Sequence, residues 1–395
     1  MRPMKIVAAG VAALLIGGSP AAAPGAHASA ADDVAITLPR PTGPYPTGTT
    51  LVHMRDERRV DPLDPAGGKR ELMVQLWYPA RPAPGKPLAA YAPPGEAAAL
   101  QVMQPDVPAG GFTAATNSRL GAPVRPGVHK VVFFHHGLCA SRTDTTAVNE
   151  QLASLGYVVV ALGSTHESWA VEFPDGRVVG PSDLAFCGAG GDPFSEEGQA
   201  ILNKLLAVRV ADTRFVLDRL AAGAGLPPGL AGAMDTRRVG MFGHSFGGGT
   251  AAAVLHADRR FVAGVDLDGF VIGPVAKTGL SKPFLVLGSS YHDTVLDPSW
   301  ADFLPRLRGW HRWLRLLDAG HYRFMDLGGS AGRWGLKEKM PPEAWRLNFG
   351  DIGDARSQEI LVSVTAAFFQ KFLCGQREPI PDYPELEDRT HLIDS

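Results

Sequence analysis

The stretch Arg237-Arg-Val-Gly-Met-Phe-Gly-His-Ser-Phe-Gly-Gly-Gly-Thr-Ala251 decides the fold of this chain. Residues 239–242 are mainly apolar and predict a short buried strand. Residues 250–255, a run of Thr, Ala, Val and Leu, predict the start of a helix. The two are joined by Gly243-His-Ser-Phe-Gly247. This is the sequence of a sharp turn, in which glycines at the first and last positions avoid a steric clash.

The context of Ser245 is that of a nucleophile elbow, which raises a serine hydroxyl above the sheet and directs a helix N-terminus towards it. A second stretch, Gly328-Gly-Ser-Ala-Gly332, has the same Gly-x-Ser-x-Gly pattern. No apolar strand precedes it and Arg333-Trp-Gly-Leu336 is a poor helix start, so we interpret it as a flexible loop. The alternative for Ser245 is a glycine-rich turn whose serine has no chemical role.

Length and composition are those of an ordinary globular protein. The 395 residues suffice for one large α/β domain or two smaller ones. Apolar residues make up 45% and charged residues 20%, which allows a sizeable core. The formal charge of −2 gives no electrostatic reason to expect a nucleic-acid partner.

Residues 1–30 have the features of a signal peptide. Arg2 and Lys5 form a basic start, residues 6–18 are an apolar run, and Ala28-Ser-Ala30 is a cleavage site. The apolar run is too short to span a bilayer. Cleavage after Ala30 would change the formal charge from −2 to about −4. We therefore expect a secreted, soluble protein without a transmembrane segment.

Three cysteines, Cys139, Cys187 and Cys374, allow at most one disulfide in an oxidising compartment and leave one thiol over. The sequence leaves open which of them pair. None has the spacing of a zinc or thioredoxin-like site, and none stands on an elbow.

Apolar strands alternate with helices along most of the chain. This alternation predicts the α/β class, with a mostly parallel central sheet and helices on both faces. Ser195 is expected to cap the longest helix. The expected strands are 51–54, 71–78, 128–135, 157–162, 239–242, 261–267, 283–287 and 313–317, and the expected helices are 96–103, 145–155, 195–222, 299–307 and 355–374.

Three segments divide the mature sequence. Residues 31–50 are rich in Pro, Gly and Thr and predict an extended lead-in, residues 51–380 form a single domain, and residues 381–395 are a polar C-terminal tail. Within the domain, residues 79–127 are expected to be a surface excursion and residues 163–194 a long loop.

His321 is the candidate base. A serine hydroxyl needs a base that accepts its proton and a third group that orients the base. In this architecture the order along the chain is serine, acid, histidine. His321 follows the strand expected at 313–317 and so lies at the edge towards which Ser245 points. His256 lies about three turns into the helix after the elbow, and His391 lies in the polar tail. The alternative for His321 is a loop histidine without a role.

Two aspartates compete for the position of the acid. Asp268 ends the strand after the elbow and precedes Gly269, so it emerges at the correct edge. Asp266 lies on the same face, deeper in that strand. Asp293 follows the next strand, where many hydrolases of this architecture place their acid. Position leaves Asp268 and Asp293 both open, and the one without this role would cap nearby amides.

Two backbone amides are expected to form an oxyanion hole. One belongs to Phe246, the residue after the serine, and the other to the loop His135-His-Gly-Leu138 after the strand at 128–135. The adjacent histidines also suggest a metal site, but neighbours on an extended segment point in opposite directions. Without a further ligand at suitable spacing, we expect neither a metal nor an organic cofactor.

Five blocks of sequence occur together in one order: Leu76-Trp-Tyr-Pro79, Phe134-His-His-Gly-Leu-Cys-Ala-Ser-Arg-Thr143, Gly243-His-Ser-Phe-Gly-Gly-Gly-Thr250, Arg260-Phe-Val-Ala-Gly-Val-Asp-Leu-Asp268 and Gly320-His-Tyr322. Together they resemble the platelet-activating factor acetylhydrolases, the secreted, calcium-independent group of α/β-hydrolase lipases and esterases. The resemblance covers roughly residues 70–375.

The resemblance implies an α/β-hydrolase fold for residues 51–380 and selects Asp268 rather than Asp293 as the acid. It also implies that Leu138 and Phe246 donate to the oxyanion. Cys139 stands where members of the family often have a small residue, and the segments 163–194 and 290–300 do not align with the family.

We therefore predict a secreted carboxylic ester hydrolase that forms an acyl-enzyme on Ser245 and needs no cofactor. The expected substrate is a short-acyl phospholipid or a related small ester, with transient contact to a lipid surface. A triglyceride lipase or a cutinase-like polyesterase shares this chemistry and is the alternative. The combination of Ser245, Asp268 and His321 argues against a non-catalytic binding protein, and the lack of an extra domain or lid argues against a peptidase.

Overall fold

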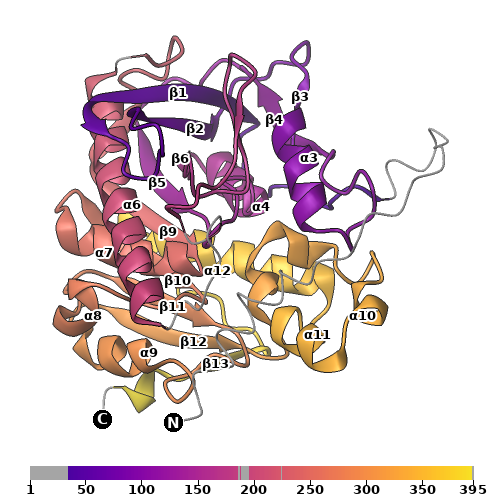
Figure 1. The fold of residues 1–395 in the computed structure, drawn as a ribbon, viewed down its shortest axis with the longest axis vertical. Helices are drawn as coiled ribbons and strands as arrows, with labels where there is room; N and C mark the ends of the chain where they lie inside the picture. Colours follow the sequence, from indigo (N-terminus) through magenta and orange to yellow (C-terminus); the bar gives the residue numbers. More distant parts are fainter. Residues whose placement is uncertain (1–33, 186, 188–194, 224, 394–395) are drawn as a thin grey trace.

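A computed structural model describes residues 34–185, 187, 195–223 and 225–393. The predicted signal peptide, residues 1–30, lies outside the described residues. The described part is built on an eleven-stranded sheet with the order β13-β12-β11-β10-β9-β5-β6-β2-β1-β4-β3 (Figure 1). A separate two-stranded sheet pairs β7 with β8. The strands are β1 (Thr47–Val60), β2 (Lys69–Pro79), β3 (Leu88–Ala90), β4 (Ala115–Leu120), β5 (His129–His135), β6 (Val158–Gly163), β7 (Val171–Glu172), β8 (Val178–Val179), β9 (Met234–His244), β10 (Phe261–Leu267), β11 (Phe284–Gly288), β12 (His311–Leu316) and β13 (Leu386–Asp388).

The centre of the sheet is parallel, as the sequence predicts. Each neighbouring pair in the series β6, β5, β9, β10, β11 and β12 is parallel. On the far side of β6, β2 and then β1 join antiparallel. The carboxyl ends of the parallel strands therefore meet at one edge, which is where sheets of this kind place their ligands.

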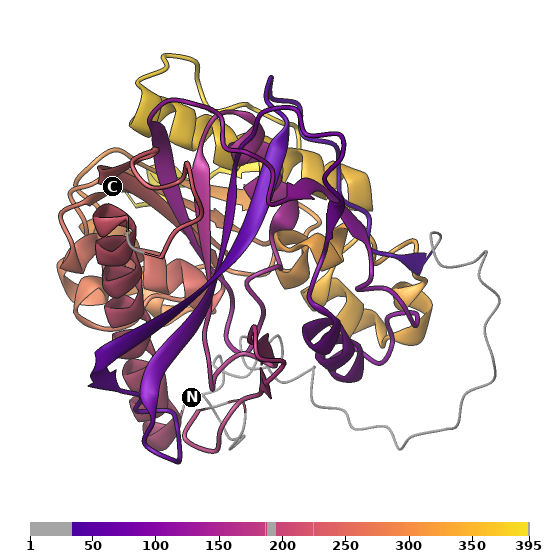
Figure 2. The ribbon, with the colours of Figure 1, turned by 90° about the horizontal axis from the view of Figure 1, so that it is seen from above.

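Helices cover both faces of the sheet. Alternate residues of β5 point to opposite faces: Val131 and Phe133 pack with α6 and α7, whereas Val132 and Phe134 pack with α4 and α12. Figure 2 shows α12 and α6 on opposite sides of the sheet. The predicted class is thus confirmed. The helices are α3 (Pro94–Met103), α4 (Thr146–Ser154), α6 (Glu196–Ala222), α7 (Phe246–Ala257), α8 (Pro274–Thr278), α9 (Pro298–Phe303), α10 (Leu336–Lys339), α11 (Pro342–Asn348) and α12 (Asp354–Cys374), with short 3-10 turns η2 (Leu304–Arg306), η3 (His321–Phe324), η4 (Asp326–Gly329) and η5 (Thr390–Leu392).

Two segments contribute more to the fold than the sequence suggests. The excursion at 79–127 holds α3, as predicted, but also β3 and β4, which extend the sheet beyond β1. Its Leu100 and Phe112 belong to a buried cluster with Tyr322 and Trp334 from the chain after β12. At the other end, the polar tail supplies β13, which pairs antiparallel with β12. β3 and β13 are only three residues long and β4 is largely polar, so their sequences lack a periodic apolar signal.

Candidate active site

Ser245 occupies the turn between β9 and α7. Its backbone has φ 55° and ψ −125°, a strained conformation that residues with side chains rarely adopt. A Cβ added to Gly243 would lie 2.1 Å from the carbonyl carbon of Gly247. A Cβ added to Gly247 would lie 2.0 Å from the carbonyl oxygen of His135. Glycine is therefore required at both ends of this turn, as the predicted elbow demands.

His321 lies beside the elbow at the start of η3. Its ring centroid is 4.5 Å from that of His244, the residue before Ser245. His244 Nε2 donates a hydrogen bond to the carbonyl oxygen of His321 at 3.0 Å. Burial, aided by the neighbouring His321, lowers the pKa of His244 to about 3, so His244 is neutral at pH 7. The His244 ring thus fixes the backbone of the predicted base.

Asp268 meets His321 from the turn after β10. The Nδ1 atom of His321 lies 2.7 Å from Oδ2 of Asp268. Asp268 also has a left-handed backbone, with φ 56°, which turns its carboxylate towards the histidine. Burial alone would raise the pKa of Asp268, but the neighbouring His292 and His321 outweigh it and hold that pKa well below its usual value. Asp268 is therefore an ionised carboxylate at neutral pH.

The other two candidate acids make different contacts. Asp293 accepts hydrogen bonds from the backbone amides of Val295 and Leu296, at 2.9 and 3.0 Å. Asp266 accepts the amide of Gly269 at 2.8 Å, and burial raises its pKa well above the usual value. The structure therefore brings Asp268, and not these two residues, against His321.

The predicted oxyanion loop packs against the elbow. A Cβ on Gly137 would lie 3.3 Å from the Cβ of Ser245, so Leu138 follows within the same turn. Phe246 is the first residue of α7, and the first amides of a helix have no acceptor within the helix. The amide of Phe246 therefore lies next to the serine at the positive end of α7, and the residue before Leu138 packs against Ser245.

The adjacent histidines of this loop point apart. His135 Nε2 lies 2.9 Å from Thr213 Oγ1, and His136 Nε2 lies 3.1 Å from Ser168 Oγ. Burial and the charge of Arg209 lower the pKa of both rings well below the usual value. Within the described residues, no three His, Cys, Asp or Glu side chains gather as metal ligands.

Arg209 of α6 supports the oxyanion loop and was missed by the sequence analysis. The fully buried guanidinium pairs with Glu167 and donates to the carbonyl oxygens of His136 and Gly137, the latter at 3.0 Å. Its carbon also lies 4.7 Å from the ring centroid of Phe246. The available signal in the sequence was an arginine on the apolar face of a long helix. That pattern does not show that Glu167, in a distant loop, pairs with the arginine.

A disulfide joins Cys139, in the oxyanion loop, to Cys187. Cys374 is a free, exposed thiol, so the expectation of at most one disulfide with one thiol left over is confirmed. Cys139 has φ 65°, and its carbonyl oxygen accepts the amide of Trp169 at 2.9 Å. The loop carrying Leu138 is thus fixed by both a covalent bond and hydrogen bonds.

The second Gly-x-Ser-x-Gly stretch is a packed turn rather than the flexible loop expected. Ser330 is fully buried at the end of η4, and its hydroxyl oxygen accepts the backbone amide of Thr37 at 2.9 Å. Ala331 beside it is also buried, in the cluster that includes Trp334. The expectation failed because the partner of Ser330 lies 293 residues away in sequence.

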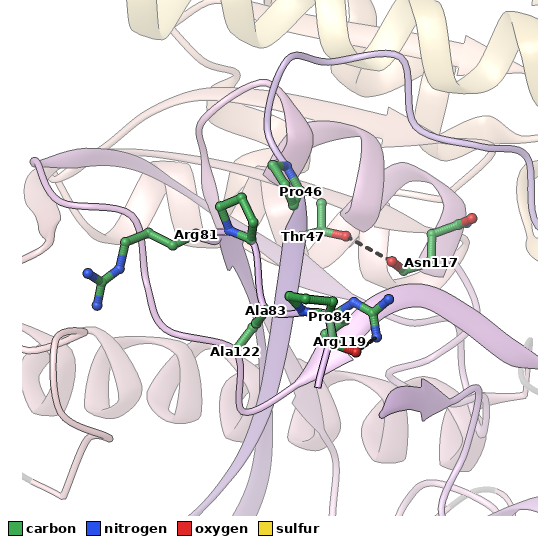
Figure 3. Close-up of a pocket in the computed structure, with 9 residues that line it drawn as sticks. Pro46, Thr47, Arg81, Ala83, Pro84, Asn117, Arg119 and Ala122 are labelled. Carbon is green, nitrogen blue, oxygen red and sulfur yellow. Dashed lines mark hydrogen bonds between the residues drawn. The ribbon is translucent and has the colours of Figure 1, made fainter. Parts of the chain in front are cut away.

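Two cavities lie away from the elbow. One of about 320 Å³, near β1 and β4, is lined in part by Thr47, Arg81 and Asn117 (Figure 3). The other, of about 550 Å³, lies between α4 and α12 and includes Gln151 and Val362 in its lining. Neither is lined by a residue of the predicted site.

Comparison with known proteins places the chain among esterases. The family model for platelet-activating factor acetylhydrolase, isoform II, matches residues 34–173 and 199–377. A probable 1-alkyl-2-acetylglycerophosphocholine esterase of Arthroderma benhamiae is 27% identical over 386 residues, covering 88% of this chain and 92% of that protein. The platelet-activating factor acetylhydrolase of Cavia porcellus is 24% identical over 280 residues, covering 65% of this chain and 60% of that protein.

A solved structure gives the same picture. The ferulic acid esterase from Streptomyces cinnamoneus aligns with a TM-score of 0.75 and 34% sequence identity. The alignment covers 89% of this chain and 98% of that one. In the part of this chain that the structure describes, no helix has the length and apolar character needed to cross a membrane.

Proposed function

Because this chain belongs to the platelet-activating factor acetylhydrolase, isoform II, family and is a carboxylic ester hydrolase, we propose that Ser245 is its nucleophile. His321 and Asp268 complete a triad. The observation that carries the proposal is the 2.7 Å contact between His321 Nδ1 and Asp268 Oδ2, beside a serine at φ 55°.

Each residue has a distinct task in this proposal. His321 Nδ1 carries a hydrogen that it donates to Asp268, which leaves Nε2 to accept the proton of the Ser245 hydroxyl. The serine oxygen then forms a bond to the ester carbonyl carbon, and the amides of Leu138 and Phe246 stabilise the negative oxygen. His321 returns the proton to the leaving alkoxide, so an acyl-serine and an alcohol result. Water, activated in the same way, releases the acid.

The substrate class is a small ester with a short acyl group. The names of the relatives in Arthroderma benhamiae and Cavia porcellus support an acetylated glycerophospholipid. The structural neighbour from Streptomyces cinnamoneus favours a second candidate, an ester of a hydroxycinnamic acid such as ferulic acid. The two candidates share the reaction and differ in whether the acyl group is aliphatic or aromatic.

A substrate panel separates the candidates. The panel contains p-nitrophenyl esters from acetate to palmitate, a short-acyl phospholipid and methyl ferulate, all assayed with purified enzyme. The proposal expects the highest kcat/KM for acetyl or butyryl groups and cleavage of the phospholipid. A maximum at palmitate would instead indicate a triglyceride lipase or a cutinase-like polyesterase, and a maximum at methyl ferulate would select the aromatic ester.

The proposed location is extracellular. The disulfide between Cys139 and Cys187 supports it, since such bonds persist in oxidising compartments. The basic and apolar character of residues 1–18 and the Ala28-Ser-Ala30 site support export by a signal peptide. Mass spectrometry of the secreted protein tests this, and a mature N-terminus at Ala31 is the expected result.

A further inference from the structure

His292 lies behind the proposed triad and has no part in the reaction steps above. It belongs to the loop between β11 and α9 and is 7% exposed. Its Nδ1 atom lies 3.1 Å from Oδ1 of Asp268, and its Nε2 atom lies 2.8 Å from Oδ2 of Asp297. A neutral imidazole carries one N–H, so only a doubly protonated ring donates to both carboxylates.

The contacts of Asp268 are divided between its two oxygens. Oδ2 faces His321 at 2.7 Å, while Oδ1 accepts the amide of Ser289 at 2.6 Å and the His292 contact. Rotation of the carboxylate would break the bonds on Oδ1. The donors on Oδ1 therefore keep Oδ2 directed at His321.

Helix α9 fixes the position of the His292 ring. Asp297 is the N-cap of α9 and accepts the amide of Ser299 at 2.8 Å through Oδ1, which leaves Oδ2 for His292. The ring of Trp300 stacks on that of His292, with centroids 3.8 Å apart and planes at 12°. Trp300 Nε1 donates to the carbonyl oxygen of Gly269 at 2.6 Å. One short helix thus holds both His292 and the turn that carries Asp268.

We propose that His292 is a positioning residue that acts through Asp268 on His321, as a cationic link between Asp297 and the triad carboxylate. The inference rests on the proposed triad of Ser245, Asp268 and His321. It gives the site a second imidazole that never touches the substrate.

The charges around His292 agree with this assignment. Burial disfavours its protonation, but Asp268 and Asp297 outweigh burial and raise its pKa to about 10. Asp266, from β10, also lies within electrostatic range of the ring, and burial raises its pKa well above the usual value, which disfavours a negative charge there. The stacked Trp300 face further favours a cation. His292 therefore carries its charge throughout the neutral pH range.

A cation behind Asp268 has a measurable effect on the base. It offsets part of the carboxylate charge felt by His321, so it disfavours a second positive charge on that ring. The acid limb of kcat/KM, which reports protonation of the base, should therefore lie at lower pH with His292 than without it. Removing the charge should move this limb to higher pH, whereas a merely structural role would leave it in place.

The test compares pH profiles of kcat/KM for p-nitrophenyl acetate. His292→Gln keeps a donor for Asp268 but removes the charge. His292→Asn is a second uncharged replacement, with a shorter side chain. Both should raise the midpoint of the acid limb by about half to one pH unit, and His292→Gln should lower kcat by about tenfold. Asp293→Asn, in the same loop, should change neither quantity.

An unshifted midpoint in folded His292→Gln overturns the inference, even if kcat falls. Where that variant does not fold, an unshifted midpoint in His292→Asn has the same meaning. Asp268→Asn, assayed in parallel, distinguishes the two proposals. Wild-type turnover in Asp268→Asn would contradict both the proposed triad and the role of His292. A large loss of turnover in Asp268→Asn, with unshifted midpoints in the His292 variants, would contradict the role of His292 alone.

Discussion

Two stretches of this chain share the pattern Gly-x-Ser-x-Gly, and the structure gives their serines opposite environments. Ser245 joins a buried strand to a helix with φ 55°, and the ring of the preceding His244 lies 4.5 Å from that of His321. Ser330 ends a 3-10 turn with φ −135°, and its hydroxyl oxygen accepts a hydrogen bond from the backbone amide of Thr37. The comparison shows that the elements on either side of the pattern, and not the pattern, determine whether a serine lies on a strained strand-to-helix turn or in a packed one.

The largest expected difference between the two serines is in turnover. Ser245→Ala should lower kcat by at least about a thousandfold, and by up to about a millionfold where the triad acts as a unit. Ser330→Ala should leave kcat per folded molecule within about twofold, because its hydroxyl accepts the backbone amide of Thr37 and lies outside the proposed site. Initial rates on p-nitrophenyl acetate measure both. Full activity in Ser245→Ala would contradict the proposed mechanism.

Ser330 has no counterpart of the Asp268–His321 pair among the described residues. Disrupting that pair should cause the next largest loss of kcat. Asp268→Asn should preserve the shape of the site but favour the wrong tautomer of His321, which costs on the order of ten-thousandfold in kcat. Asp293→Asn should cost less than about tenfold, since the Asp293 carboxylate accepts the amides of Val295 and Leu296 in its own loop. The reverse ranking would assign the acid to Asp293.

The glycines of the two stretches sharpen the comparison through stability. In Gly247→Ala the new methyl group would lie 2.0 Å from the carbonyl oxygen of His135, so the turn must open, at a cost of about 3 kcal/mol in the free energy of unfolding. In Gly332→Ala the nearest atoms are the carboxylate oxygens of Asp354, at 3.1 Å, and this side chain can shift. Its cost should stay below about 1 kcal/mol. Urea unfolding of both variants gives the two values, and equal values would show that the elbow is not tightly constrained.

The smallest expected effect is that of the two serine hydroxyls on the free energy of unfolding. For this quantity Ser330→Ala should have the larger effect and Ser245→Ala the smaller. Ser330→Ala removes the hydrogen bond from the Thr37 amide to the fully buried Ser330 hydroxyl, which should lower the free energy of unfolding by about 1 kcal/mol. Ser245→Ala should leave stability unchanged or raise it slightly, because the hydroxyl of an active site contributes little to packing. Thermal unfolding of the two variants measures this. A larger loss of stability in Ser245→Ala than in Ser330→Ala would contradict the interpretation that Ser330, and not Ser245, contributes to packing.

The sequence predicts the centre of the fold and the candidate nucleophile because both depend on local signals. The apolar strand before Gly243 and the small residues after Gly247 together specify the elbow, and Ser195 caps α6 as predicted, accepting the amide of Gly198 at 3.0 Å. The choice of Asp268 needed the family resemblance, since Asp268 and Asp293 both follow strands that end at the same edge.

Long-range contacts explain what the sequence does not reveal. Arg209 lies on a helix whose pattern gives no sign that Glu167 and two loop carbonyls surround it. His292 depends on a carboxylate at each ring nitrogen, and one of the two belongs to the turn after another strand. Burial of Ser330 depends on the lead-in near Thr37, at the other end of the chain. Such contacts join segments that are far apart in sequence, so the periodicity of apolar residues does not predict them.

The most direct test of the central claim is the site of covalent modification by a fluorophosphonate. The reagent is added to the wild-type enzyme until hydrolysis of p-nitrophenyl acetate stops, and the modified peptide is identified by mass spectrometry. We predict one adduct, on Ser245, that forms in step with the loss of activity, and an unmodified Ser330. Complete inhibition with Ser245 unmodified, or an adduct on Ser330, would contradict the claim that the elbow holds the nucleophile.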